Sequence, residues 1–492
     1  MDFIDMKDIS KHIVSGFKWE TILKMLQQAV SFIVNIIIIR FLMPEDYGLV
    51  SLVAVVMNIL LVVVDMGLNT AIIQKKNIDR GHLSTAFFIN MGVGVVLFAL
   101  IQVLSPVIGE YYKKPQMVPY LKTFSVVFII RAASSVQVAL TGRELNFKKS
   151  TIINMISVFL GTIVKIILAY LGYGVWSIIY GEIVSQICIT IMFWIDTDFH
   201  ISIYEVNGRY FRDIFRFGIN VMLINLLTIV SQQIDMVVIG RILPSVKVGL
   251  YSIAFSISTG LPAHINSITQ KVMFPAFLTF QDDDKGISES YFKLIKFLGL
   301  VSLPICAGII FVIPEFTSIA LKDKWMPAVP IIQILCIYAM SNSLGGILWG
   351  QLLKAKGHIR TVIWMTCIRL CSMIVFILIG AQWGLLGIAW SITIYGWIFR
   401  FLYQGVVNRI IYADMGNFMQ SVLPSIVATG IMSIGLMFLK RLLILVELPE
   451  LAIMLATILF GISIYVAAVY ILYKKDFLAL WHSIGVLFNN GQ

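Results

Sequence analysis

The chain has 492 residues, of which 59% are hydrophobic and only 13% are charged. A soluble protein commonly carries about 25% charged residues, which keep its surface hydrated. The composition therefore excludes a soluble globular protein and indicates one that is solvated by lipid. The formal net charge of +11 does not indicate nucleic-acid binding, because the basic residues are dispersed among short segments and form no dense patch.

The hydrophobic residues form blocks of roughly 20, the length of an α-helix that crosses a hydrocarbon layer ~30 Å thick. We predict an all-α membrane protein with about fourteen transmembrane helices. In chain order, the blocks cover residues 18–40, 47–69, 83–105, 117–140, 150–171, 174–195, 215–240, 249–271, 289–313, 327–353, 359–379, 384–408, 419–440 and 450–473. The segments between them are short, so no domain outside the membrane is predicted.

Basic residues mark one set of alternate loops. Lys75, Arg143 and Lys354 are examples, and both termini join this set through Lys7 and Lys474. Loops rich in Lys and Arg remain on the cytoplasmic side of a membrane. We therefore predict a multi-pass protein with both termini in the cytoplasm. The N-terminal segment lacks the pattern of a cleaved signal peptide.

The sequence also contains an internal repeat. The segment from Arg40 through Pro44 to Gly48 recurs from Arg241 to Gly249, about 200 residues later. Further matches follow in the same register: residues 35–40 with 235–241, Gly142 with Gly350, and residues 172–174 with 382–384. A repeat unit with an even number of helices gives two copies of the same orientation, related by an axis along the membrane normal. We predict an N-terminal six-helix lobe in residues 1–200, a C-terminal six-helix lobe in 201–412, and two extra helices with a cytoplasmic tail in 413–492.

Several ionisable residues lie inside the apolar blocks, where each costs about 2.5–3.5 kcal/mol unless it is paired or faces water or a ligand. They are Lys24, Asp65, Arg131, Lys165, Glu182, Asp235, Lys271 and Arg369, with His264 as a further polar residue. Structural pairing is one interpretation. Lys24 and Asp65 have similar predicted depths, as do Lys165 and Glu182, whereas Lys271 can extend its ammonium group to the interface.

Arg131 and Arg369 are harder to explain by pairing, because neither has an acidic residue at its depth in the adjacent helix. We predict that both line a polar cavity. Cations in a wall of low dielectric constant attract anions, and arginine binds phosphate with a bidentate fork. A pyrophosphate group is therefore a candidate ligand.

The sequence contains no motif for catalysis, for nucleotide binding or for a metal site, so we predict a protein that is not an enzyme and that needs no cofactor. Transport would then take its energy from substrate or ion gradients. The acidic residues that could couple transport to H⁺ or Na⁺ are Asp235 and, with less support, Asp65 and Glu182.

Six regions carry a family resemblance: residues 40–48, 65–74, 215–218, 233–241, 274–283 and 325–330. Through their order and spacing, the sequence resembles the Wzx-type polysaccharide and O-antigen flippases of the multidrug/oligosaccharidyl-lipid/polysaccharide (MOP) exporter superfamily. Within it, the sequence is most similar to the branch that exports colanic acid and teichuronic acid. The resemblance implies a V-shaped, MATE-like core of two lobes that alternates its access to a cationic central lumen.

The resemblance also implies roles for individual residues. Lys24, His264 and Lys271 would line a lateral portal, and Arg131, Lys165 and Arg369 would line the lumen. The implied substrate is an oligosaccharide repeat unit on undecaprenyl pyrophosphate, moved from the inner to the outer leaflet of the bacterial plasma membrane for lipopolysaccharide or exopolysaccharide synthesis. A polysaccharide polymerase or chain-length regulator is an implied partner, beside the membrane lipid.

Two alternatives stay open. A cation-coupled exporter of small molecules or drugs, of the MATE type, would need an acidic lumen, which the basic bias of this chain does not favour. A membrane enzyme such as a polysaccharide polymerase or ligase commonly has a large outer loop, and the sequence contains no long polar segment for one.

Overall fold

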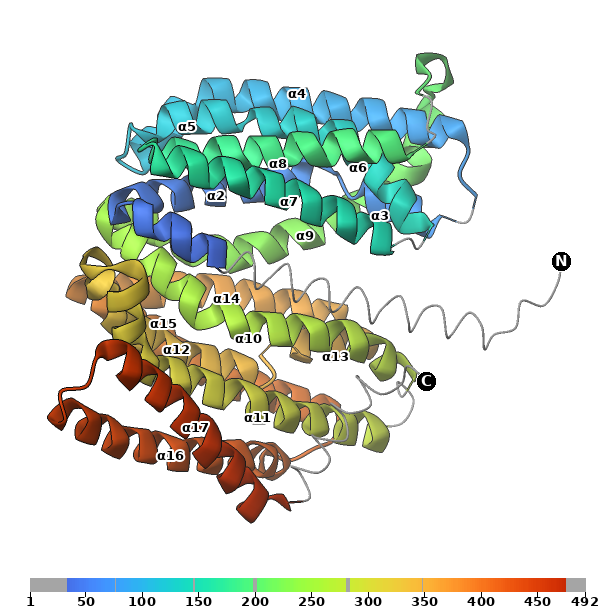
Figure 1. Cartoon of the computed structure of the whole chain (residues 1–492). Coiled ribbons are helices and arrows are strands. Elements are labelled where there is room, and N and C mark those ends of the chain that lie inside the picture. The colour runs from blue at the N-terminus through green and yellow to red at the C-terminus, as the bar shows by residue number, and fades with distance from the viewer. Residues whose placement is uncertain are drawn as a thin grey trace. The chain divides into compact units, whose positions relative to one another are not determined.

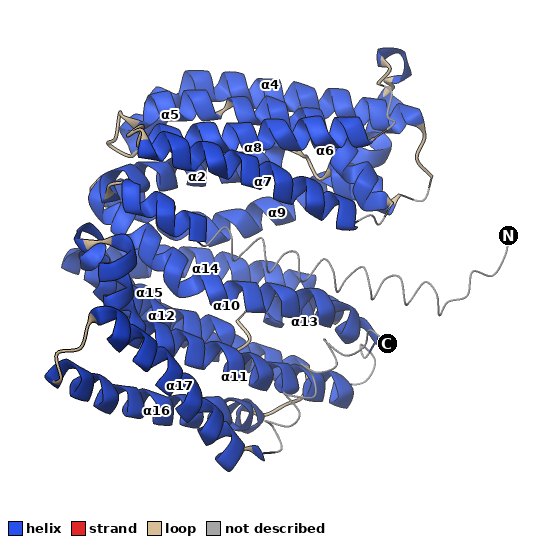
Figure 2. Cartoon of the chain, viewed as in Figure 1, coloured by secondary structure: helices blue, strands red, loops and turns tan. Residues whose placement is uncertain are grey.

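The computed structural model describes residues 33–75, 77–144, 147–197, 201–279, 284–346 and 348–474. Within these ranges the chain forms helices and the turns between them, and no strand (Figure 2). The prediction of an all-α fold is confirmed. Backbone groups in a hydrocarbon layer find no water to bond, so a helix, which satisfies its own backbone groups, is the structure that an apolar block of this length adopts.

Twelve segments of the described residues are long and apolar enough to cross a membrane. One of them, Ile359–Ile410, contains two helices, α14 (Ile359–Gly380) and α15 (Gly384–Ile410), joined by a short 3₁₀ turn. The first predicted helix lies mostly outside the described residues, and its described part, residues 33–41, is helical. With this helix included and α14 and α15 counted separately, the structure agrees with the prediction of about fourteen transmembrane helices.

The chain folds as two compact units, Met1–Gly249 and Leu250–Asn490. The described helices of the first unit (Figure 1) are α2 (Pro44–Val64), α3 (Leu68–Gln74), α4 (Arg80–Tyr111), α5 (Met117–Phe124), α6 (Val126–Arg143), α7 (Phe147–Tyr170), α8 (Val175–Asp196) and α9 (Gly208–Ile242), with the 3₁₀ turn η1 (Ile203–Glu205). Buried apolar side chains such as Ile72, Phe87 and Val136 form a core between α3, α4 and α6. Ile214 of α9 belongs to the same core.

Helix α9 follows residue 200, where the sequence suggests that the second lobe starts, yet it packs on the first unit. Lys75 forms an ion pair with Asp213 of α9 (3.1 Å). A Cβ atom on Gly240 would lie 2.9 Å from the ring of Tyr112. The compact units therefore divide after α9, and the predicted lobe boundaries at residues 200 and 412 stay a statement about the sequence repeat.

The second unit contains α10 (Ser245–Thr279) from Leu250 onward, α11 (Asp284–Phe316), α12 (Val329–Ser343), α13 (Leu348–Ala355), α14, α15, α16 (Met415–Leu445) and α17 (Glu450–Leu472), and the short turns η2 (Thr317–Leu321), η3 (Asp323–Ala328) and η4 (Ala381–Trp383). Its largest core joins Tyr291 and Ile295 of α11 to Leu352 of α13, Tyr403 of α15 and Phe418 of α16. The unit is thus held by apolar contacts between helices that lie far apart in the sequence.

The two extra helices, α16 and α17, pack on α11. Lys440 forms an ion pair with Glu315 (2.8 Å), and both side chains are largely buried. Lys440 also donates to the carbonyl oxygen of Phe311 (2.6 Å). The hydroxyl of Tyr465 donates to the carbonyl oxygen of Leu300 (2.6 Å). These contacts attach the extra helices to the second unit.

The internal repeat is visible in the local structure. Gly174 and Gly384, which are matched in the sequence, have positive φ angles of 52° and 72°. Gly174 directly precedes α8, and Gly384 begins α15. The matched glycines Gly48 and Gly249 lie against each other, since a Cβ atom on Gly249 would overlap the carbonyl oxygen of Pro44. Equivalent positions of the two copies therefore adopt similar local structures.

Candidate functional site

A broken helix lies in the second unit, inside the candidate membrane span Asp323–Ala355. Helix α12 ends at Ser343 and α13 begins at Leu348, with a turn over residues 344–346. Gly345 has a φ angle of 90°, a conformation that favours glycine. Non-helical backbone at membrane depth occurs where protein buries it or where it lines a cavity.

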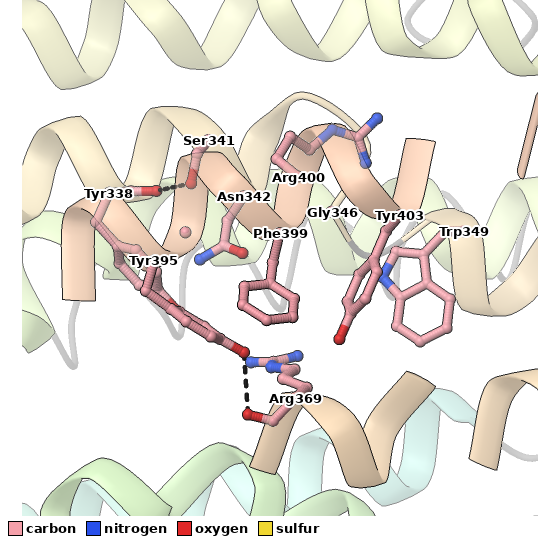
Figure 3. Close-up of a pocket in the computed structure, with 11 residues that line it drawn as sticks. Tyr338, Ser341, Asn342, Gly346, Trp349, Arg369, Tyr395, Phe399, Arg400 and Tyr403 are labelled. Atoms are coloured by element: carbon pink, nitrogen blue, oxygen red, sulfur yellow. Dashed lines mark hydrogen bonds between the residues drawn. The ribbon is translucent and has the colours of Figure 1, made fainter. Parts of the chain in front are cut away.

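A small cavity lies beside this turn, with an empty volume of about 390 Å³ that includes open solvent (Figure 3). Its lining comes from α12, α13, α14, α15 and the turn: Tyr338, Ser341, Asn342, Gly346, Trp349, Arg369, Tyr395, Gly396, Phe399, Arg400 and Tyr403. This lining combines five aromatic rings with two arginines and contains no acidic residue. A cavity of this composition favours an anionic ligand that also has an apolar face.

Arg369, a residue that the sequence predicts to line a polar cavity, lies in this cavity on α14. It is half-buried, and no acidic side chain in the described part of the chain pairs with it. The hydroxyl of Tyr395 donates to the carbonyl oxygen of Arg369 (3.0 Å), and that of Tyr403 donates to the carbonyl oxygen of Met365 (2.8 Å). Figure 3 shows both hydroxyl ends directed toward the side of the cavity that holds Arg369. These bonds fix α14 against α15 and hold Arg369 in place.

Arg400 of α15 is the second cation of the cavity, and its side chain is 4% exposed. One terminal nitrogen, Nη2, donates to Oε1 of Gln404, which also accepts from the hydroxyl of Tyr291 (3.0 Å). The guanidinium carbon lies 5.0 Å from the ring centre of Phe418. Its Nε and Nη1 atoms have no hydrogen-bond partner in the structure. Arg400 is therefore a buried cation whose hydrogen-bonding capacity is only partly used.

Sequence reasoning missed Arg400, which lies in the predicted block 384–408. A signal was present: Arg400, Gln404 and Asn408 are spaced by four residues and so share one helix face. In the structure, Nε2 of Gln404 donates to Oδ1 of Asn408 (2.6 Å), and all three side chains are buried. A polar ladder of this kind in an apolar block marks the face that turns away from lipid.

In the first unit, the structure brings Asp65 and Arg131 together. Arg131 is exposed on α6, and its charge acts on the carboxyl group of Asp65, which lies at the end of α2. The Oδ1 atom of Asp65 has no hydrogen-bond partner in the structure. The prediction for Arg131 considered the adjacent helices alone, whereas Asp65 follows α2, a helix that is distant from α6 in the sequence.

The predicted pairing of Lys165 with Glu182 is confirmed. Their side chains form an ion pair of 2.7 Å between α7 and α8. The stem of Lys165 also packs closely on Gly181. The ion pair thus joins α7 to α8.

A further buried lysine, Lys114, lies between α4 and α5 and was not singled out from the sequence. Its ammonium group donates to the carbonyl oxygens of Gly240 (2.6 Å) and Leu243 (3.0 Å) at the end of α9. Burial, followed by the nearby charge of Arg241, lowers the pKa of Lys114. Its three carbonyl contacts, of which the third is with Tyr112, indicate that it stabilises the end of α9.

The sequence model of a family described as "Polysaccharide biosynthesis protein" matches residues 37–330, more than half of the chain. The chain belongs to this family. Lipopolysaccharide biosynthesis protein WzxC of Escherichia coli (strain K12) is 26% identical over 75% of this chain and 75% of its own length. Teichuronic acid biosynthesis protein TuaB of Bacillus subtilis (strain 168) is 26% identical over 87% of this chain and 89% of its own length. The resemblance to polysaccharide flippases is thereby confirmed.

Solved structures give the fold of this polysaccharide biosynthesis protein. The lipid II flippase MurJ in an inward closed conformation has a TM-score of 0.71 and 14% identity, and the match covers 93% of this chain and 99% of that one. An inward-facing multidrug resistance transporter of the MATE family has a TM-score of 0.64 and 16% identity, and the match covers 78% of this chain and 94% of that one. At these identities the likeness establishes the flippase and MATE type of fold.

The remaining predicted residues of this family member do not gather at the cavity. Asp235 is buried in α9, with 3% exposure, and His264 is half-buried in α10. Lys271 lies on α10, but its side chain is outside the described residues, as is the whole of Lys24. Of the residues predicted from the sequence to bind substrate, Arg369 alone is among those that line the described cavity.

Proposed function

We propose that this protein is a flippase that moves oligosaccharide repeat units, linked to undecaprenyl pyrophosphate, from the inner to the outer leaflet of the bacterial plasma membrane. Membership of the polysaccharide biosynthesis family and the flippase-type fold support transport in surface polysaccharide synthesis. The observation that carries the proposal is the cavity on spanning helices with two arginines and no acidic residue in its lining. Unpaired cations at this depth are costly, and an anionic ligand offsets that cost.

The proposed mechanism is alternating access by the two duplicated halves. The head group would enter a central cationic lumen, to which Arg131, Lys165 and Arg369 contribute, while the polyprenyl tail remains in lipid. Lys24, His264 and Lys271 would line the lateral portal. Both termini would lie in the cytoplasm, and Asp235, Asp65 or Glu182 would couple transport to an ion. A polymerase or chain-length regulator would receive the product.

A cation-coupled exporter of small molecules is the second candidate, and the unpartnered carboxyl oxygen of Asp65 favours it. A cationic drug, however, would meet two arginines and no acidic residue in the lining of the cavity of the second unit. The two candidates therefore differ in the charge of the molecule that is bound.

Reconstitution into vesicles tests the proposal. Purified protein is inserted into liposomes that contain a fluorescent lipid-linked oligosaccharide, and a membrane-impermeant quencher is added outside. Because the probe starts in both leaflets, protein-free vesicles should lose about half of the fluorescence, whereas vesicles with an active flippase should lose nearly all of it. Equal quenching with and without protein contradicts the proposal, and so does deletion of the gene without accumulation of inner-leaflet intermediates.

Arg369 gives the matched test of the site. We expect Arg369→Ala to impair transport more than Arg369→Lys, because lysine keeps the charge but lacks the bidentate fork. Arg360→Gln is the control, since Arg360 is an exposed arginine on the same helix, outside the cavity lining. Normal transport by an inserted Arg369→Ala protein would remove Arg369 from the site.

A further inference from the structure

A cluster of ionisable side chains joins α3, α4 and α9 in the first unit. The ammonium group of Lys75, which directly follows α3, lies 2.8 Å from Nε2 of His82 in α4. It also donates to Oδ2 of Asp213 in α9, at 3.1 Å. The same carboxylate oxygen lies 3.7 Å from Nε2 of His82. A lysine and a histidine thus share one carboxylate.

Further groups surround the imidazole of His82. Oδ2 of Asp79, at the start of α4, lies 3.8 Å from Nδ1. The ring of Tyr210 in α9 packs on the imidazole, with 4.4 Å between the ring centres. Arg143 of α6 is close as well, because its Nη1 donates to the carbonyl oxygen of Lys75. The imidazole therefore contacts charged groups of both signs.

The contact between Lys75 and His82 requires a neutral imidazole. An ammonium group only donates hydrogen bonds, so Nε2 of His82 accepts from Lys75 and carries no proton. The proton of the neutral ring is then on Nδ1, which faces Asp79. His82 is 4% exposed, so little water screens a second positive charge placed against Lys75. Protonation of His82 therefore removes the acceptor and creates repulsion between two cations.

Asp213 is placed to change its partner when this happens. Its carboxylate is already within 3.7 Å of the ring nitrogen that takes up the proton, so an ion pair with protonated His82 needs little movement. The side chain of Lys75 is 30% exposed and can turn to solvent, whereas the imidazole is packed on Tyr210 and stays in place. The proton thus transfers Asp213 from Lys75 to His82.

The loop before α9 is attached to α4 by contacts that contain no imidazole. The backbone amide of Asn207 donates to Oγ1 of Thr85 (3.2 Å), and Glu205 accepts from the hydroxyl of Ser84 (3.4 Å). The end of α3, by contrast, meets the first turns of α9 through Lys75. A change of partner at Asp213 therefore acts on the attachment of α3 to α9.

We infer that Lys75, His82 and Asp213 form a pH-sensitive switch, which fastens the end of α3 to the first turns of α9 at neutral pH and releases it when His82 is protonated. In the released state Asp213 pairs with His82, and Lys75 is in solvent. The basic loops predict that this end of the unit faces the cytoplasm, so the switch responds to cytoplasmic acidification. The inference goes beyond the proposed function and involves no transported molecule.

The test is amide hydrogen exchange of the purified full-length protein in detergent, followed by mass spectrometry. Exchange is measured at about pH 7.5 and about pH 5.5, on either side of the usual imidazole pKa, and is corrected for its intrinsic pH dependence. We expect protection of residues 68–75 and 208–216 to fall roughly tenfold at the acidic pH, because release of Lys75 lets both segments open more often.

Two variants assign the effect to this cluster. His82→Gln should keep its protection at both pH values, because glutamine accepts from Lys75 and takes up no proton. Lys75→Gln should also keep its protection at the acidic pH, since protonated His82 then pairs with Asp213 without a competing cation. His358→Gln is the control. His358 is an exposed histidine of the second unit, and its replacement should leave the tenfold fall unchanged.

Equal protection of the two segments at both pH values in the wild-type protein would overturn the inference. A fall in Lys75→Gln as large as that in the wild-type protein would overturn it as well, because the repulsion between Lys75 and His82 would then have no effect. Lys75 is partly exposed, so this variant keeps the test decisive even where His82→Gln folds poorly.

Discussion

In each unit a spanning helix stops and a short helix continues the chain after a turn, and the two turns differ in how they are packed. In the first unit α2 gives way to α3 through Met66 and Gly67, with φ angles of 45° and 69°. Gly67 lies directly on the backbone of Gly218 in α9. In the second unit the turn between α12 and α13 contains Gly345, whose neighbours are the side chains of Ile295 and Arg400.

The charges at the two turns differ as well. The carboxyl group of Asp65 begins the first turn, and the charge of Arg131 acts on it, so charges of both signs lie near this turn. The second turn lies beside a cavity with Arg369, Arg400 and no acidic lining residue. A balanced turn packed on backbone is suited to hold a unit together. The second turn packs on side chains and lies beside positive charges without an acidic neighbour in the cavity lining, so these charges are able to bind an anionic ligand.

The largest expected effect is that of Gly67→Ala. The new Cβ atom would overlap the carbonyl oxygen of Gly218, and alanine at a φ angle of 69° adds strain. Because backbone cannot move aside as a side chain can, we expect a loss of about 3 kcal/mol of folding free energy. The loss is measured as a decrease in the melting temperature of the purified protein in detergent. Gly92→Ala is the control, since its Cβ would meet nothing within 4 Å. Equal melting of the two variants would show that the first turn is not rigidly packed.

Gly345→Ala should cost less, although its φ angle of 90° is also strained for alanine. The nearest atoms belong to side chains and not to backbone: Cγ1 of Ile295, at 3.0 Å, and Nη2 of Arg400, at 3.1 Å. We expect a loss of about 1–2 kcal/mol, mostly from the backbone. Melting is compared with that of Gly350→Ala in α13, which meets no neighbouring atom. A loss as large as that of Gly67→Ala would remove the distinction between the two turns.

The sequence predicted the helices well, because block length and hydrophobicity decide them. It did not predict the second turn, which contains Gly345 and Gly346. Glycine is common in membrane helices, so two glycines in an apolar block do not by themselves indicate a break. Arg369 was found because a charge in mid-block is conspicuous. Arg400 was missed although its spacing with Gln404 and Asn408 indicated a polar helix face. The effect of the Arg131 charge on Asp65 was missed because it depends on which helices pack together, and one sequence does not contain that information.

A double-mutant cycle on Asp65 and Arg131 tests the charge balance of the first turn. Asp65→Asn should leave Arg131 without its counter-charge, and Arg131→Gln should have the converse effect. We expect the double variant to be less impaired than the sum of the two, with a coupling of about 1 kcal/mol in melting experiments. Lys165→Gln is the comparison. Because Lys165 pairs with Glu182, its effect should add to that of Asp65→Asn. Additive effects of Asp65→Asn and Arg131→Gln would contradict the balance.

The smallest effect on stability is expected for Arg400→Met. Methionine has a similar length, and it removes a buried charge with two unpartnered nitrogens. Gln404 keeps the hydroxyl of Tyr291 as a donor (3.0 Å). Replacing a buried charge by an apolar residue of similar volume is often neutral, so the change should stay within about 1 kcal/mol.

Binding of the lipid-linked oligosaccharide proposed as substrate should nevertheless weaken in Arg400→Met, because the cavity loses one of its two cations. Arg400→Ala is the companion variant. It should melt at a lower temperature than Arg400→Met, since it leaves an unfilled space beside Phe418. If Arg400→Met leaves the stability unchanged and weakens binding, the role of Arg400 is to bind the ligand. Strong destabilisation by Arg400→Met, with binding unchanged in the remaining folded protein, would instead make Arg400 a structural part of the second turn.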